Sequence, residues 1–232
     1  MVACLIILAL AFDLFSIEAN ADSVKPATIS AIHGEEQLDQ FLKDRPQLSR
    51  IVRKGNTLWN WLRDGFGNEK DGIRIFWENK PTSDFNSFGA ESRFTADSNN
   101  VYIRVDRCYK KGEFAQIERS AEEILIDIVF ELNNAKNRSR RLELGDLADR
   151  GQISKHDYAL AIAKEEYTAS LDTGAFYTQI WIPFCHAHNF EYEAFLWSFT
   201  SYGNFDSWLG SFPKDSGYPF RSYGKELDQS RL

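Results

Sequence analysis

Glu131 lies in a predicted helix at a position where its carboxylate could act as a general base. Residues 129–135 read Val-Phe-Glu-Leu-Asn-Asn-Ala, and helical spacing would place Asp127, Phe130, Glu131 and Asn134 on one face. A zinc hydrolase built on such a face needs two imidazoles one turn apart, with the carboxylate between them acting as general base on metal-bound water. Glu131 could be that base. Phenylalanine cannot bind a metal, however, and asparagine offers only a carbonyl oxygen, which is a weak zinc ligand.

The pattern nevertheless resembles that of the gluzincin-type metallopeptidases, with the zinc motif H-E-x-x-H replaced by F-E-x-x-N. Glu166 opens the sequence Glu-Tyr-Thr-Ala-Ser on the next long predicted helix, and it resembles the ligand glutamate of that family. The resemblance covers roughly residues 47–172. It implies a zincin-like fold with Glu131 at the general-base position and Glu166 at the third-ligand position, while Phe130 and Asn134 replace the two histidines.

The missing histidines favour a pseudoenzyme. We expect an exported zincin-like protein that acts as a non-catalytic binding or interaction module for a protein or peptide partner, with no cofactor. Phe130, Asn134 and Glu166 would then be the degenerate cleft positions that contact the partner, and no metal ligand is expected.

Two other functions stay open. A divergent metal-dependent hydrolase would keep Glu131 as its base and use a non-zinc metal, or zinc recruited through His186 and His188, which stand two residues apart in Cys-His-Ala-His. A structural secreted helical protein unrelated to peptidases would leave Glu131 on a solvated face. In an intermediate case Glu131 is buried and needs a partner, for which the candidates are Lys164, Tyr167 and the amide of Asn134.

The beginning of the chain has the pattern of a secretory address. Residues 1–12 are an unbroken apolar run, too short to span a bilayer, and Ala19-Asn20-Ala21 follows as a small-x-small cleavage site. We therefore predict a signal peptide over residues 1–21, a secreted or periplasmic location, and no stable membrane span after cleavage.

The net charge argues against one class of partner, and the cysteine content leaves one disulfide possible. The net charge is −7 at pH 7, which argues against an extended nucleic-acid interface. Beyond the predicted leader the chain keeps Cys108 and Cys185, which could form one disulfide or remain two free thiols.

Periodicity predicts an α+β fold that is mostly helical, with a small antiparallel or mixed sheet packed on the motif helices. The predicted helices cover residues 35–44, 47–66 with a break at Gly55, and 154–172 with a stop near Gly174. Between them lies the motif helix, with a capping-box pattern at Ser120 and Glu123 and a possible earlier start near residue 113. Residues 137–145 are polar and are expected to interrupt the helices. The predicted strands cover residues 73–78, 93–96 and 101–105, and residues 183–189 are predicted as a loop.

Aromatic residues concentrate near the end of the chain. Residues 176–224 hold 16 of the 33 aromatic side chains. They could form a stacking platform for a sugar or peptide, but we favour packing against the core, because aromatic side chains carry much of the buried area of a protein. The predicted organisation is a signal peptide (1–21), a zincin-like domain (22–175) and an aromatic-rich C-terminal extension (176–232) on the same core.

Overall fold

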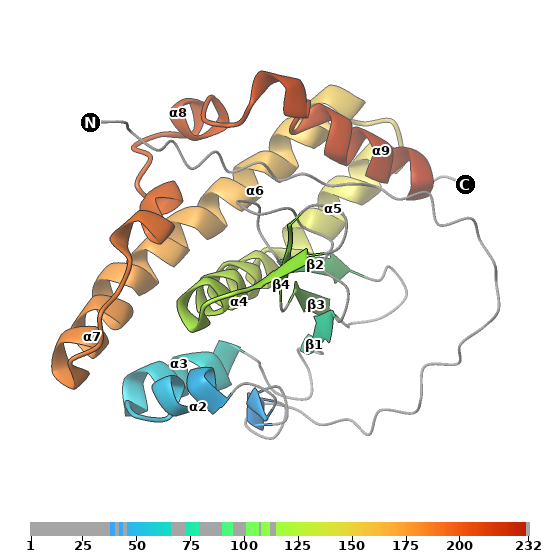
Figure 1. Cartoon of the computed structure of the whole chain (residues 1–232). Coiled ribbons are helices and arrows are strands. Elements are labelled where there is room, and N and C mark those ends of the chain that lie inside the picture. Colours follow the sequence, from blue (N-terminus) through green and yellow to red (C-terminus); the bar gives the residue numbers. More distant parts are fainter. Residues whose placement is uncertain are drawn as a thin grey trace, which may run out of the picture.

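Helices make up most of the structure, and the strands form two small sheets (Figure 1). The structure is a computed structural model that describes residues 38–39, 42–43, 46–65, 73–78, 90–94, 101–106, 108–111 and 115–230. The predicted signal peptide lies outside this range, as does the chain between the predicted strands at residues 93–96 and 101–105. The prediction of a mostly helical chain with a small sheet is confirmed.

Two short helices are separated by Gly55, where the sequence predicts a break. Helix α2 (Pro46–Val52) is followed by α3 (Asn56–Gly65), with Gly55 between them. Each helix buries two apolar residues one turn apart, namely Leu48 and Val52 in α2 and Leu58 and Leu62 in α3. That spacing is the helical periodicity visible in the sequence.

A three-stranded mixed sheet follows these helices in the chain. Its order is β1 (Ile73–Glu78), β3 (Val101–Asp106) and β2 (Ala90–Phe94), with β1 parallel and β2 antiparallel to the central β3. Ile103 and Val105 of β3 are buried, as their alternation predicts. Strand β2 begins three residues before the predicted strand at residues 93–96.

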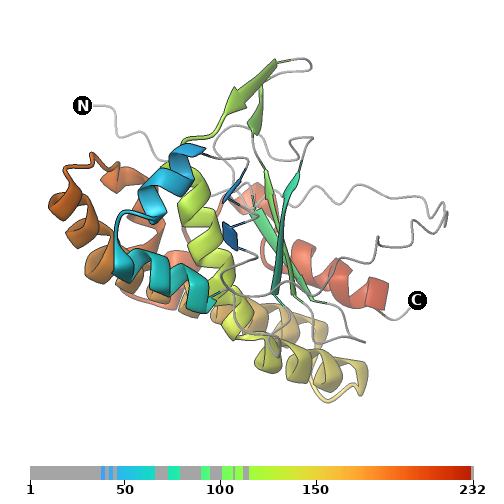
Figure 2. The same ribbon diagram turned by 90° about the horizontal axis from the view of Figure 1, so that it is seen from below.

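A hairpin of β4 (Cys108–Lys111) and β5 (Ala115–Glu118) follows and projects away from the helices (Figure 2). The predicted early start of the motif helix near residue 113 is therefore wrong. The helix, α4 (Ala121–Lys136), begins only after Ser120. The Ser120 hydroxyl accepts from the Glu123 amide (3.1 Å), and the Glu123 carboxylate accepts from the Ser120 amide (2.6 Å). The predicted capping box is confirmed.

Substituting this cap tests its contribution to the start of α4. Replacing Ser120 with alanine is expected to lower the free energy of unfolding by about 1 kcal/mol, because the Glu123 amide loses its acceptor. The urea unfolding midpoint measures the change. Ser139→Ala, at an exposed serine within α5, is the control and should leave the midpoint unchanged; equal midpoints for the two variants would contradict a role for the cap.

Helix α4 is the centre of the fold. All twelve residues from Ile124 to Ala135 are buried, so the helix is enclosed all round instead of presenting one apolar stripe. Strands β2 and β3 contact it on one side, as Figure 2 shows, and α6 packs along another side. The motif residues therefore lie inside the protein.

The polar interruption predicted after α4 is wrong. Helix α5 (Arg138–Asp149) begins directly after Asn137, and its polar composition reflects a helix that buries few residues, among them Leu144 and Ala148. Helix α6 (Lys155–Phe176) begins where the helix over residues 154–172 is predicted, and its N-cap is Ser154, whose hydroxyl accepts from the Asp157 amide (3.1 Å).

Helix α6 does not stop near Gly174 as predicted. A β-carbon at Gly174 would lie 3.1 Å from Cβ and Oγ1 of Thr200, so this glycine allows close packing of the segment that returns across the helix. The helical path continues without interruption through a π-helical segment, η1 (Tyr177–Trp181), into α7 (Ile182–His188). The loop predicted at residues 183–189 is therefore wrong, because Pro183 occupies the first turn of α7, where a helix tolerates proline.

The chain then folds back along α6 through short helices, η2 (Ala194–Thr200), α8 (Phe205–Leu209), η3 (Lys214–Ser216) and α9 (Phe220–Ser230). Their aromatic residues are buried in two clusters. Trp181, Trp197 and Phe199 join α4 and β3 in the first, and Trp208, Phe212, Tyr218 and Tyr223 join α5 and the first half of α6 in the second. The preference for core packing over a stacking platform holds for these side chains. Within the part of the chain that the structure describes, no helix is both long and apolar enough to cross a membrane.

Candidate functional site

Glu131, at the general-base position of the motif, lies inside the protein. Only 6% of its surface is exposed, so the solvated-face interpretation is wrong. The side-chain amide of Asn134 donates to Glu131 Oε2 at 3.3 Å. Asn134 was one of the three partners expected for a buried Glu131. The other two are engaged elsewhere: Tyr167 donates to the carbonyl of Tyr202 (3.1 Å), and Lys164 lies over the ring of Phe205.

The two residues at the histidine-ligand positions are also buried. Phe130 is 4% exposed and packs edge-on against Phe199, with ring centroids 5.8 Å apart. Asn134 is 2% exposed, and its Oδ1 atom has no hydrogen-bond partner among the described residues. Phe130 therefore fills core volume, while Asn134 uses its amide nitrogen to hold Glu131.

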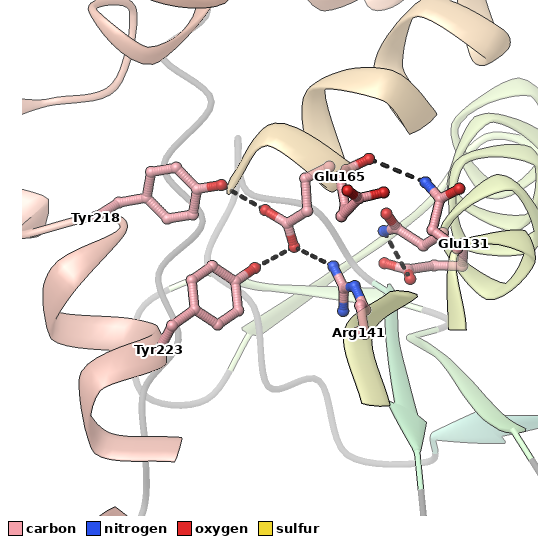
Figure 3. A network of polar contacts seen from close by, with 8 residues as sticks. Glu131, Arg141, Glu165, Tyr218 and Tyr223 are labelled. Atoms are coloured by element: carbon pink, nitrogen blue, oxygen red, sulfur yellow. Dashed lines mark hydrogen bonds and ion pairs between the residues drawn. The ribbon is translucent and has the colours of Figure 1, made fainter. Parts of the chain in front are cut away.

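Glu166, at the third-ligand position, is the centre of a buried polar network (Figure 3). Tyr218 donates to its Oε2 atom at 2.5 Å, and both Tyr223 and Arg141 donate to Oε1, the latter at 3.1 Å. Arg141 comes from α5, Tyr223 from α9 and Tyr218 from the segment just before α9. Three donors thus converge on one carboxylate of α6. Oxygen atoms that already accept these donors have fewer lone pairs left for a metal.

Glu131 and Glu166 lie on two helices, α4 and α6, that pack directly on each other. In the view of Figure 3, Arg141 lies between Glu131 and the two tyrosines. A neighbouring bond supports the same helix pair, since the Asn137 side chain at the end of α4 donates to the carbonyl of Glu165 (3.1 Å). The arrangement ties α4, α5, α6 and α9 together around buried carboxylates.

Sequence reasoning missed the three partners of Glu166. Tyr218 and Tyr223 are 52 and 57 residues away in the chain, and no local pattern connects them with a glutamate on α6. Only a general chemical rule could have pointed to them. A buried carboxylate requires hydrogen-bond donors, and residues 138–149 and the C-terminal segment contain arginine and tyrosine side chains that could donate.

The network predicts an alkaline limit to stability. Burial, followed by the negative charge of Glu166, raises the pKa of Tyr218 well above its ordinary value near 10. The folded protein therefore keeps a proton that the unfolded chain releases above about pH 10, so this contribution is complete below that pH and is lost as the pH rises beyond it. Urea midpoints between about pH 8 and 11 measure the decline.

Two variants assign that decline to its source. Tyr218→Phe should make the midpoint fall less steeply with pH, because phenylalanine has no proton to lose. Tyr202→Phe, at a half-buried tyrosine outside the Glu166 network, should keep the wild-type slope. Identical slopes for Tyr218→Phe and the wild type would contradict the assignment.

The histidines of the alternative zinc site lie on α7, not in a loop. His186 is exposed beside Tyr192, and His188 is half-buried beside Phe184. Among the described residues, no three His, Cys, Asp or Glu side chains gather into a group that could hold a metal. Cys108 and Cys185 are free thiols, and burial, with a smaller effect of Glu122, raises the pKa of Cys185 to about 12.

No protein family, curated protein or solved structure matches this chain.

Proposed function

We propose that this protein is an exported, non-catalytic binding module, a zincin-like chain in which the motif residues maintain the fold. One observation carries the proposal: the Glu166 carboxylate, at the third-ligand position, accepts hydrogen bonds from Tyr218, Tyr223 and Arg141. A metal at this position would have to displace donors that are themselves buried, and each displaced donor would cost free energy.

The positions beside Glu131 support the same proposal. Phe130 supplies no ligand atom and packs in the core against Phe199. The amide of Asn134 donates to Glu131, so the carboxylate serves as an acceptor within α4. A general base must also reach a substrate or a bound water, and Glu131 is only 6% exposed.

The metal content of the protein is the first test. The protein is purified without chelator or metal-affinity tag, and elemental mass spectrometry measures its zinc, manganese and iron. We expect no stoichiometric metal and no change in melting temperature when zinc is added. Stoichiometric zinc that is lost in a His186→Ala, His188→Ala double variant would instead support the divergent hydrolase.

A hydrolysis assay with matched variants tests the absence of catalysis. A fluorogenic peptide library should show no turnover above a blank for the wild type, for Glu131→Gln or for Glu165→Gln. Glu165 is the control because it is a half-buried glutamate on α6 next to the network. Turnover that Glu131→Gln abolishes and Glu165→Gln retains would overturn the proposal.

Export is tested separately. N-terminal sequencing of the protein recovered from outside the cytoplasm of an expressing cell should begin at Asp22. A mature protein that retains Met1 would contradict the predicted signal peptide.

A further inference from the structure

A surface pocket lies away from the motif, where the start of α3 meets η1 and α7. Its volume is about 400 Å³, near the lower end of the range for small-molecule sites. Helix α3 and η1 are in contact, and α7 continues from η1 (Figure 1). The lining residues are Lys54, Gly55, Asn56, Thr57, Gln179, Ile180, Pro183, Phe184, Ala187 and His188.

Two backbone features shape this pocket. A β-carbon at Gly55 would lie 2.7 Å from the ring of Phe184, so only glycine lets the turn before α3 approach α7 this closely. On the other side, Gln179 and Ile180 belong to the π-helical segment η1, and π-helical turns are frequent at functional sites. The break at Gly55, which the sequence shows as an interruption between two helices, therefore also forms one wall of the pocket.

The side chains around the pocket include basic but no acidic residues. The chain carries a net charge of −7, yet none of the ten lining residues is Asp or Glu, and Lys54 and His188 are basic. The Lys54 ammonium lies 4.7 Å from the ring centroid of Phe190, and no carboxylate among the described residues pairs with it. The adjacent Arg53, in contrast, is paired with Asp39.

The polar lining supplies further donors. Asn56, Thr57 and Gln179 line the pocket and carry amide or hydroxyl groups that can donate hydrogen bonds. The carbonyl of Gly55 accepts the first hydrogen bond of α3, from the Trp59 amide at 3.0 Å, and Gly55 has no side chain to cap the free amides that follow. The positive end of α3 thus adds to the attraction exerted by the Lys54 ammonium.

The rest of the wall is apolar, formed by Ile180, Pro183 and Phe184. We propose that this pocket binds a small organic anion, a carboxylate or phosphate group joined to an apolar or aromatic body. Lys54, Asn56 and Thr57 hold the anionic group, and the apolar wall takes the body of the ligand. This inference rests on the proposed function, since it names the ligand class of a binding module, but its site shares no residue with the motif.

Isothermal titration of the wild-type protein with phenyl phosphate, 3-phenylpropionate and the neutral 3-phenylpropanol tests the ligand class. We expect saturable binding of at least one anion and binding of the neutral alcohol that is about tenfold weaker or more. A preference for phenyl phosphate would identify phosphate as the source of the charge, and a preference for 3-phenylpropionate would identify carboxylate. Equal binding of the alcohol, or saturation by neither anion, would overturn the proposal.

Matched variants place the binding in the pocket. Lys54→Met keeps the aliphatic stem and should weaken anion binding about fivefold. Lys164→Met is its control, because Lys164 also lies over a phenylalanine ring, that of Phe205. Ala187→Phe should fill the pocket and abolish binding, whereas Ala175→Phe, at an exposed alanine of α6, should not.

Failure of the pocket assignment and failure of the proposed function give different results. Wild-type affinity in both Lys54→Met and Ala187→Phe would overturn the pocket assignment, even for a metal-free and inactive protein. Hydrolysis that depends on Glu131 would overturn the non-catalytic proposal without changing the binding of phenyl phosphate at Lys54.

Discussion

Glu166→Ala is expected to lower the free energy of unfolding by about 3–5 kcal/mol, because it removes the carboxylate that pairs with the largely buried Arg141 and accepts from two buried tyrosines. The Arg141 side chain is 12% exposed and donates to Glu166 at 3.1 Å, and the hydroxyl groups of Tyr218 and Tyr223 lose the same acceptor. Glu166→Gln keeps one carbonyl acceptor and should cost less, about 1–3 kcal/mol. Urea denaturation followed by tryptophan fluorescence measures both values.

The position of the Glu166 network predicts which helix loses its protection first in Glu166→Ala. Helix α9 packs on α6, and Glu166 holds it there through Tyr223 and through Tyr218 just before the helix. Amide hydrogen exchange in Glu166→Ala should therefore accelerate first in α9, whereas α4, which lies in the other cluster, keeps its protection longer.

A neighbouring residue provides the control. Glu165→Ala removes a half-buried glutamate next in sequence but keeps the backbone carbonyl that accepts from Asn137. Its free energy of unfolding should stay within about 0.5 kcal/mol of the wild type. A Glu166→Ala variant as stable as Glu165→Ala would show that the network contributes little to stability.

The local features of the fold could be predicted because adjacent residues determine them. The Ser120 capping box, the Ser154 cap and the break at Gly55 each depend on residues within one helical turn. The hydrogen bond from Asn134 to Glu131 is also a local feature, since its two partners are three positions apart on one helix.

The errors occurred where tertiary packing overrides local composition. Helix α5 is polar because it buries little, so its sequence looks like a loop. The stop predicted at Gly174 failed because that glycine serves close packing against Thr200. The β4–β5 hairpin has strands of only four residues, too short for a clear alternation.

In the candidate site, too, the sequence predicts some residues, whereas others are brought together only by tertiary packing. Sequence spacing singled out Glu131 and Glu166, and both are buried polar residues with specific partners. The donors to Glu166 come from segments 25 to 57 residues away, and only the folded chain brings them together. The pocket at Lys54 likewise depends on the meeting of the α2–α3 junction with α7, which no single segment encodes.

A second buried charge pair should be as sensitive as Glu166. The guanidinium of Arg119, just before α4, pairs with Asp127 within α4, and the two side chains are 1% and 2% exposed. Arg119→Met is expected to lower the free energy of unfolding by about 3–5 kcal/mol, because Asp127 is left as a buried charge without its cation. Urea denaturation measures the loss, and Asp127→Leu should cause one of similar size.

The double variant separates pairing from other contacts of the arginine. Burial opposes the charge on Arg119, but the Asp127 carboxylate and the Tyr109 side chain together more than offset that effect and raise the pKa of the guanidinium, so Arg119 stays charged. Arg119→Met combined with Asp127→Leu removes both charges and should therefore be more stable than the sum of the single losses predicts, by about 1.5 kcal/mol or more.

Full recovery is not expected in the double variant. Arg119 also donates to the carbonyls of Asp106 (3.2 Å) and Glu123 (3.3 Å) and lies over the ring of Tyr109, with 4.8 Å between its Cζ and the ring centroid. These contacts join the end of β3 and the hairpin to the first turn of α4, and methionine cannot replace them. The double variant should thus remain about 1–3 kcal/mol less stable than the wild type.

An exposed pair on α5 supplies the contrast. Arg140 pairs with Glu143 at 2.6 Å, but both side chains are about half exposed, so water replaces the lost partner in Arg140→Met. Its urea midpoint should match that of the wild type, whereas that of Arg119→Met should fall. Equal midpoints for Arg119→Met and Arg140→Met would contradict a stabilising role for the buried pair and would mean that water reaches Asp127 once the arginine is gone.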